Sequence, residues 1–370
     1  MKSASSSIVH WILCFLLFTF SFSFVSAQNH ESDSLLNVLK TQKDDTNRIF
    51  TLDAESSVLQ ALGKFDSARA YSQIALDLAE RLDNKKGEME SLHELGNSYW
   101  HQGNYPKSKE YHLKAIEIAR AINSKLGISS NLSSLGIVYE MEGNYPKALE
   151  CYLEALSIFK EKGQKTGIAS IYSDLGNIYA EQLDYKKSIE FSEKSLALDE
   201  EIGNEGGISN NLINLGVTYC SLNNYPKALE CYNKALVHEQ KLGEVDAIAT
   251  IQNDMGLVYF LQGDYDKALE NYDKALEMSR KIGDAEGVGS YLINVGSAYT
   301  RLKKYDKAGM YLDSGLNMMK RMGVKSEVGE AYINLSLLDS ATGNYKQALH
   351  DYKLYVTYND SLINEANTKK

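Results

Sequence analysis

Proline and cysteine are scarce in this chain: its 370 residues include 3 prolines and 4 cysteines. Long stretches also lack the alternation of β-branched and polar residues that half-buried strands require. Hydrophobic residues make up 44% and charged residues 24% of the chain, so its composition is that of a folded protein and not of a disordered one. These features predict an all-α fold class.

The chain has no excess of basic residues, because its formal net charge at pH 7 is −10. A charge of this sign repels phosphate backbones, so we expect no nucleic-acid partner. The motifs G-x-S-x-G and H-E-x-x-H are absent, as are the phosphate-binding glycine loop and the dinucleotide fingerprint. We therefore expect a protein that is not an enzyme, without catalytic residues, cofactor or small-molecule substrate.

The first 27 residues differ from everything that follows. Residues 11–20 are almost continuously apolar, Lys2 precedes them, and Val25-Ser26-Ala27 supplies the small residues that a signal peptidase prefers. We expect a signal peptide at residues 1–27 and an exported protein, either periplasmic or associated with the cell envelope. An uncleaved anchor is the alternative, because residues 8–25 could nearly span a bilayer; this segment would then be the only membrane contact.

A repeat of 40 residues organises the sequence from residue 46 to residue 365. One position of the repeat is glycine in six units, at Gly96, Gly136, Gly176, Gly216, Gly256 and Gly296, and a tyrosine follows each glycine three residues later. Another tyrosine position recurs from Tyr105 to Tyr345, with Phe65 one period earlier. Self-similarity at a fixed period predicts stacked units, here about eight. We expect a lead-in helix at residues 28–45 and a polar tail at residues 366–370.

Each unit contains two segments with the apolar spacing of an amphipathic helix. The second segment follows an Asn or Asp that can cap it, namely Asn104, Asn144, Asp184, Asn224, Asp264 and Asn344. A glycine inside a helix costs about 1 kcal/mol relative to alanine, so its recurrence needs a reason. We expect Gly216 to let the two helices of its unit meet without side chains between them, with Ala228 and Ala235 facing it and tyrosines at the edges.

The pattern L-G-x-x-Y followed by G-N-Y-x-K-A-L-x-x-Y-x-K-A-L resembles the tetratricopeptide repeat (TPR). The resemblance covers residues 46–365, and the period of 40 is longer than the standard 34, as in the extended repeats of kinesin light chains and spindle-orientation adaptors. It implies a right-handed α-solenoid superhelix of helix-turn-helix repeats. D-S-L at residues 33–35 and Y-x-x-x-x-D-S-L at residues 355–362 also resemble the exported sensory region of TPR-containing bacterial histidine kinases and regulators.

The same resemblance implies that the first helix of each unit lines a concave groove that binds an extended peptide or protein segment. The candidate groove residues are Asn97, Asn177, Asn214, Asn253, Asn294 and Asn334, with Trp100 and Phe260 as apolar anchors. A carboxamide both donates and accepts hydrogen bonds, so it can hold a peptide backbone. Alternatively, the amides only solvate the surface or bond neighbouring helices, and the two aromatic residues pack between repeats. Of the basic residues, only Arg301 is expected near the groove, which favours an extended or basic partner over an acidic tail.

Two smaller alternatives concern cysteine and histidine. Cys151 and Cys231 occupy equivalent places two repeats apart, too far to bridge, and we expect them to be small buried residues. A disulfide between Cys220 and Cys231 within one unit stays open. His93, His101 and His112 hint at a metal, but two imidazoles bind one ion best at i, i+4 spacing, so we expect no metal site.

The sequence thus predicts an exported protein–protein interaction scaffold. The alternative is a sensory or input module of a bacterial signal-transduction system whose output domain is missing or on another chain.

Overall fold

The computed structural model describes residues 31–368, with side chains as far as residue 362. All regular secondary structure in this range is helical, which confirms the all-α fold class. The predicted signal peptide at residues 1–27 lies outside the described residues. None of the described helices is both long enough and apolar enough to cross a membrane.

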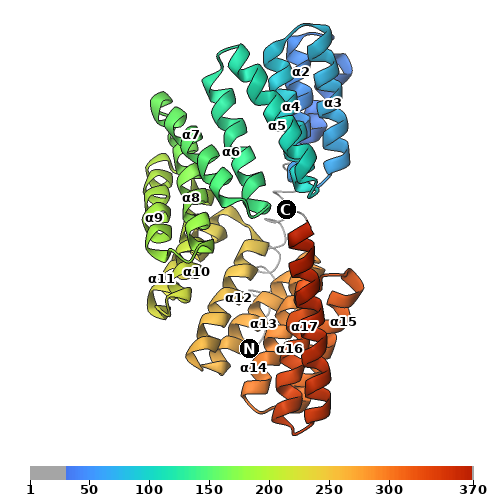
Figure 1. Cartoon of the computed structure of the whole chain (residues 1–370), viewed down its shortest axis with the longest axis vertical. Coiled ribbons are helices and arrows are strands. Elements are labelled where there is room, and N and C mark those ends of the chain that lie inside the picture. Colours follow the sequence, from blue (N-terminus) through green and yellow to red (C-terminus); the bar gives the residue numbers. More distant parts are fainter. Residues whose placement is uncertain (1–30, 369–370) are drawn as a thin grey trace, which may run out of the picture. The chain divides into compact units, whose positions relative to one another are not determined.

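Each repeat contributes two helices joined by two or three residues, which confirms eight repeats (Figure 1). The bounds of the helices are α2 (Thr46–Ala61), α3 (Phe65–Arg81), α4 (Lys85–His101), α5 (Tyr105–Ala121), α6 (Lys125–Met141), α7 (Tyr145–Lys162), α8 (Lys165–Glu181), α9 (Tyr185–Ile202), α10 (Glu205–Ser221), α11 (Tyr225–Leu242), α12 (Val245–Gln262), α13 (Tyr265–Ile282), α14 (Ala285–Arg301), α15 (Tyr305–Met322), α16 (Lys325–Ala341) and α17 (Tyr345–Thr368). A further helix covers residues 31–41, within the range expected for the lead-in helix. Helix α17 extends into the range expected as a polar tail.

Side-chain caps fix where the second helices begin. Asn104, for example, accepts a hydrogen bond from the backbone N–H of Lys107, and this places Pro106 in the first turn of α5. Asn144, Asp184, Asn224 and Asp264 cap their helices in the same way. Such a cap satisfies one of the backbone donors that a helix leaves free at its start, so the local sequence sets these boundaries.

The recurring glycine accommodates an aromatic ring, which differs from the expected arrangement. A Cβ atom on Gly216 would lie 2.6 Å from Cε1 of Tyr232, a residue that is only 2% exposed. The prediction that the helices meet at Gly216 without side chains between them is therefore wrong: the ring of Tyr232 lies over the glycine, although Ala228 and Ala235 are fully buried. The physical reason is that a long side chain on the second helix fills the space that the missing Cβ leaves.

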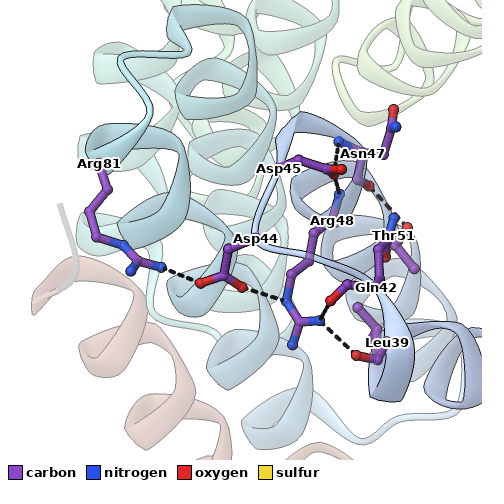
Figure 2. A network of polar contacts seen from close by, with 8 residues as sticks. All are labelled: Leu39, Gln42, Asp44, Asp45, Asn47, Arg48, Thr51 and Arg81. Carbon is purple, nitrogen blue, oxygen red and sulfur yellow. Dashed lines mark hydrogen bonds and ion pairs between the residues drawn. The ribbon is translucent and has the colours of Figure 1, made fainter.

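Arg48 of α2 forms hydrogen bonds that connect the helix at residues 31–41 to the first repeat (Figure 2). Its Nη1 donates to the carbonyl oxygens of Leu39 at 2.6 Å and Gln42 at 2.9 Å, where that helix ends. The carboxylate of Asp44 lies 3.3 Å from Nε of Arg48 and 3.3 Å from Nη2 of Arg81 on α3. Terminal carbonyls that have no partner within their own helix are satisfied in this way.

The described residues form two compact units with their boundary between Gln182 and Leu183, in the loop between α8 and α9. In unit 1 the first helices of successive repeats, α2, α4, α6 and α8, contact one another, and in unit 2 α10, α12, α14 and α16 do so. Within the described part of each unit, second helices of successive repeats approach one another less closely. Each unit therefore curves toward its first helices, which form its concave side. We call this side the inner surface.

Lys303 occupies a turn position where several other repeats have glycine. Its φ is 58°, in the left-handed region, and the equivalent Gly263 has a φ of 81°. A left-handed conformation costs an L-residue about 1–2 kcal/mol, whereas glycine adopts it freely.

We expect Lys303→Gly to raise the free energy of unfolding by about 1 kcal/mol, because the exposed lysine loses its backbone strain. Urea unfolding followed by circular dichroism measures the change. The reciprocal variant Gly263→Lys should destabilise by a similar amount, and equal stability of all three proteins would contradict the prediction.

Candidate peptide-binding surface

A pocket of about 540 Å³ opens on the inner surface of unit 1, between α2, α4 and α6. We call it the inner-surface pocket. Its lining includes Phe50 and Asp53 of α2, Lys86, Met89, Glu90, His93 and Glu94 of α4, and Ser130 and Asn131 of α6. First helices of three successive repeats thus place apolar, acidic and amide side chains around one space.

Asp53 is the most deeply buried acid of the inner-surface pocket, with 7% of its surface exposed. Its Oδ2 accepts a hydrogen bond of 2.8 Å from Oγ of Ser91, whereas its Oδ1 has no hydrogen-bond partner among the described residues. Burial, with a smaller contribution from the nearby carboxylates of Glu94 and Glu90, raises the pKa of Asp53 to about 8. The carboxyl group of Asp53 is therefore mostly protonated at pH 7.

The other two acids of the pocket have partners. Oε2 of Glu94 accepts a hydrogen bond of 2.8 Å from Nε2 of Gln60, and Oε1 of Glu90 lies 3.6 Å from Nζ of Lys86. Nζ of Lys86 also lies 5.2 Å from the ring centroid of Phe50, so this ring already faces a cation. Because Lys86 is largely exposed, it sits at the rim and leaves the interior of the pocket acidic.

His93 and His112 meet at Asn131. Their Nδ1 atoms lie 3.0 Å and 3.1 Å from Oδ1 of Asn131, and because an amide oxygen accepts, each Nδ1 donates. Burial lowers the pKa of His112 to about 3, so this ring is neutral. His101 lies apart from the pair and stacks on Phe65 with ring centroids 5.0 Å apart. Within residues 31–368, no group of three metal-ligating side chains is placed to hold an ion.

Three of the six candidate asparagines are held by the protein itself. Nδ2 of Asn294 on α14 donates to Oδ1 of Asn253 on α12 at 2.8 Å. Nδ2 of Asn334 donates to the carbonyl oxygen of Glu330 in its own helix at 2.9 Å. These contacts match the alternative in which the amides bond within and between helices.

The remaining three, Asn97, Asn177 and Asn214, are half-buried on first helices. Their side chains form no hydrogen bonds with other residues that the structure describes. Asn97 and Asn177 belong to unit 1, and Asn214 belongs to unit 2. These three amides are therefore available to a partner.

The two expected apolar anchors contact other side chains of the protein. Phe260 packs against the buried core residues around Val295 and Ala298, and the guanidinium of Arg301 lies 5.8 Å from its ring centroid. The ring of Trp100 lies 4.6 Å from that of His101. Phe260 therefore contributes to packing between repeats, and Arg301, the basic residue expected near the groove, already faces an aromatic ring.

Sequence reasoning missed Asp53 because the first repeat lacks the glycine and tyrosine that mark six of the other repeats. The spacing nevertheless contained a signal, since Asp53 lies 40 residues before His93 and occupies the repeat position of Asn253. Extending the alignment into the first repeat would have placed Asp53 on the inner surface.

The three described cysteines are free, so the alternative disulfide between Cys220 and Cys231 is not formed. Cys151 is buried, as predicted, whereas Cys231 is half-buried. Burial raises the pKa of the Cys151 thiol to about 11, which makes it a poor nucleophile.

A family model described as tetratricopeptide repeat matches residues 51–121, 87–161, 167–236 and 247–321, more than half of the chain. No curated protein matches the sequence significantly. Among solved structures, aspartyl phosphate phosphatase F from Bacillus subtilis has a TM-score of 0.65 and 14% identity, over 97% of this chain and 95% of that one.

Two further solved structures are similar. The apo form of the quorum sensor NprR from B. thuringiensis has a TM-score of 0.63 and 15% identity, over 89% of this chain and 98% of that one. A Rap protein complexed with competence and sporulation factor has a TM-score of 0.59 and 13% identity, over 88% of this chain and 100% of that one. At these identities the similarity concerns the fold alone, and it agrees with the predicted α-solenoid.

Proposed function

Because the chain belongs to the tetratricopeptide repeat family, we propose that it is a protein–protein interaction scaffold that binds an extended peptide or protein segment on its inner surface. The observation that carries this proposal is the inner-surface pocket, which first helices of three successive repeats line with apolar, acidic and amide groups. Pockets that bind ligands combine apolar walls with a few placed polar groups in this way. The proposal includes no catalytic step.

The half-buried amides of unit 1 support a peptide rather than a compact ligand. Asn97 and Asn177 lie on α4 and α8, so amide groups recur along the inner surface beyond the pocket. An extended backbone offers alternating N–H and C=O groups, which carboxamides can bond. A Rap protein of the same fold was solved in complex with competence and sporulation factor, which shows that this fold can carry a binding partner.

The proposal also places the protein outside the cytoplasm, in the periplasm or at the cell envelope, on the basis of the predicted signal peptide. A sensory input role is the second candidate, favoured by the two D-S-L motifs at residues 33–35 and 360–362. The two roles differ in the partner: another envelope protein for the scaffold, and a membrane signalling protein for the sensory module.

Photocrosslinking tests the proposed binding surface. A benzoylphenylalanine at Ser130, an exposed position in the pocket lining, should crosslink a partner from an envelope extract. The same group at Leu113, exposed on the second helix α5, is the matched control. We expect a discrete crosslinked polypeptide from position 130 and at least tenfold less from position 113. Equal labelling at both positions, or none at either, would argue against binding on the inner surface.

A further inference from the structure

The inner-surface pocket contains a buried polar atom that the protein leaves without a partner. Oδ1 of Asp53 is inaccessible to bulk solvent and has no hydrogen bond among the described residues, although Asp53 lines an open pocket. Leaving a buried polar atom unsatisfied costs about 1–3 kcal/mol, so such an atom in a pocket indicates a group that arrives with a ligand.

The residues around Asp53 indicate the charge of the ligand group that would bond it. Glu90 and Glu94 lie close enough to raise the pKa of Asp53 through their negative charge. Lys86, the only lysine or arginine in the lining, lies largely exposed at the rim. The pocket interior therefore favours a positive charge, since an anion would meet three carboxyl groups.

The apolar residues that line the inner-surface pocket indicate the shape of the ligand group. Phe50 and Met89 give the pocket an apolar side, next to the carboxyl groups. A lysine or arginine side chain combines an apolar stem with a charged head, and such side chains bury the stem while the head finds a polar partner. The ring of Phe50 also attracts cations, as the position of Lys86 over it indicates.

We propose that the inner-surface pocket binds the side chain of one lysine or arginine of the partner segment, whose cationic head donates a hydrogen bond to Oδ1 of Asp53 after rotation of the carboxyl group exposes this oxygen to the pocket. This inference rests on the proposed function, because it identifies the side chain that the bound segment must present. A cation beside Asp53 favours the ionised carboxylate, so Asp53 releases its proton when the partner binds.

Selection from a displayed library of random dodecapeptides tests the inference with the purified protein. Wild type should enrich peptides with lysine or arginine at one fixed position. A synthetic peptide from this pool and its copy with norleucine at that position are then compared by titration calorimetry. Because a hydrogen bond to a charged group contributes about 1.5–3 kcal/mol, norleucine should weaken binding to wild type about 10- to 100-fold.

Asp53→Asn is the test variant, because asparagine keeps the shape of the side chain and cannot ionise. With this variant the lysine and norleucine peptides should bind equally within about twofold. Glu90→Gln, which removes a charge that Lys86 already pairs, should change the preference for lysine by no more than about twofold. Asp77→Asn, an exposed change on α3 outside the pocket, is the control and should keep the full preference.

Three results would overturn the inference. Selected peptides that compete with one another for the pocket, and yet bind equally well with norleucine in place of lysine, would contradict a cationic ligand. This result would leave the proposed peptide-binding function intact. A preference for lysine that persists in Asp53→Asn would show that another group recognises the cation. If no peptide is enriched from the library, this result would contradict both the cationic ligand and the proposed peptide-binding function.

Discussion

Replacing Asp53 with asparagine should stabilise the protein progressively more as the pH rises from 4 to 8. Burial raises the pKa of Asp53 in the folded protein to about 8, from an ordinary value of 3.8. Between these values the folded state holds a proton that the unfolded chain has lost, so the stability of wild type falls with rising pH. Asparagine has no such dependence, and the difference grows by at most about 1.4 kcal/mol per pH unit.

The measurement is urea unfolding of wild type and Asp53→Asn at pH 4, 6 and 8. The titratable groups of the pocket lining besides Asp53 are those of α4, namely Lys86, Glu90, His93 and Glu94, whereas the α6 side contributes Ser130 and Asn131. Asp77→Asn serves as the exposed control. Relaxation of the pocket will reduce the effect, and we expect a total gain of about 2–4 kcal/mol at pH 8 relative to pH 4. A difference that is the same at all three values would mean that Asp53 is ionised in the folded protein.

This result would connect stability with binding. The same substitution that stabilises the empty protein should abolish the preference for a cationic side chain. A buried acid that lowers stability at neutral pH is retained more easily if it contributes to function, because natural sequences often trade stability for activity at their sites. Asp53 therefore offers one variant with two opposite expected outcomes, greater stability and weaker recognition.

Gly136→Ala should destabilise the protein by about 2–3 kcal/mol, although alanine is ordinarily the better helix former. A Cβ atom at this position would lie 2.5 Å from Cε1 of Tyr152. The ring cannot easily move away, because Tyr152 is fully buried and its hydroxyl donates to Oε2 of Glu140 at 2.8 Å. Overpacking a closed core costs more than the helix propensity returns.

The control for this prediction is Gly309→Ala on α15. An added Cβ at Gly309 meets only Cδ2 of Leu338, at 3.8 Å, which is ordinary contact. We therefore expect Gly309→Ala to stabilise by as much as about 1 kcal/mol. Thermal and urea unfolding of the two variants decide the matter, and destabilisation of both by the same amount would show that the ring over Gly136 is not the cause.

The prediction of eight two-helix repeats succeeded because its signals are local. The cap at Asn104 and the proline that follows it lie within a few residues of the boundary they set, and the period of 40 makes each unit predict the next. The arrangement at the glycines was predicted wrongly, since helical spacing places residues on a face but does not say which side chain of the second helix reaches across. At Gly216 that side chain is Tyr232.

The candidate asparagines show the same limit. Their repeat position is visible in the sequence, yet Asn294 bonds Asn253 while Asn214 does not bond another described side chain. The difference depends on which residue of the neighbouring repeat lies opposite each amide. Such contacts join residues about one period apart in the sequence, as Asn253 and Asn294 are, with a separation of 41.

By itself, then, the sequence determined the helices, their caps and the repeat, because these depend on spacing within 40 residues. Only the tertiary structure decided which inner-surface groups are already satisfied and which are left open. The carboxyl group of Asp53 accepts a hydrogen bond on one oxygen from Ser91, 38 residues away, and Asp53 lines a pocket that helices of three repeats enclose. Burial and unsatisfied hydrogen-bonding capacity arise from packing between repeats, and the order of residues along the chain does not contain them directly.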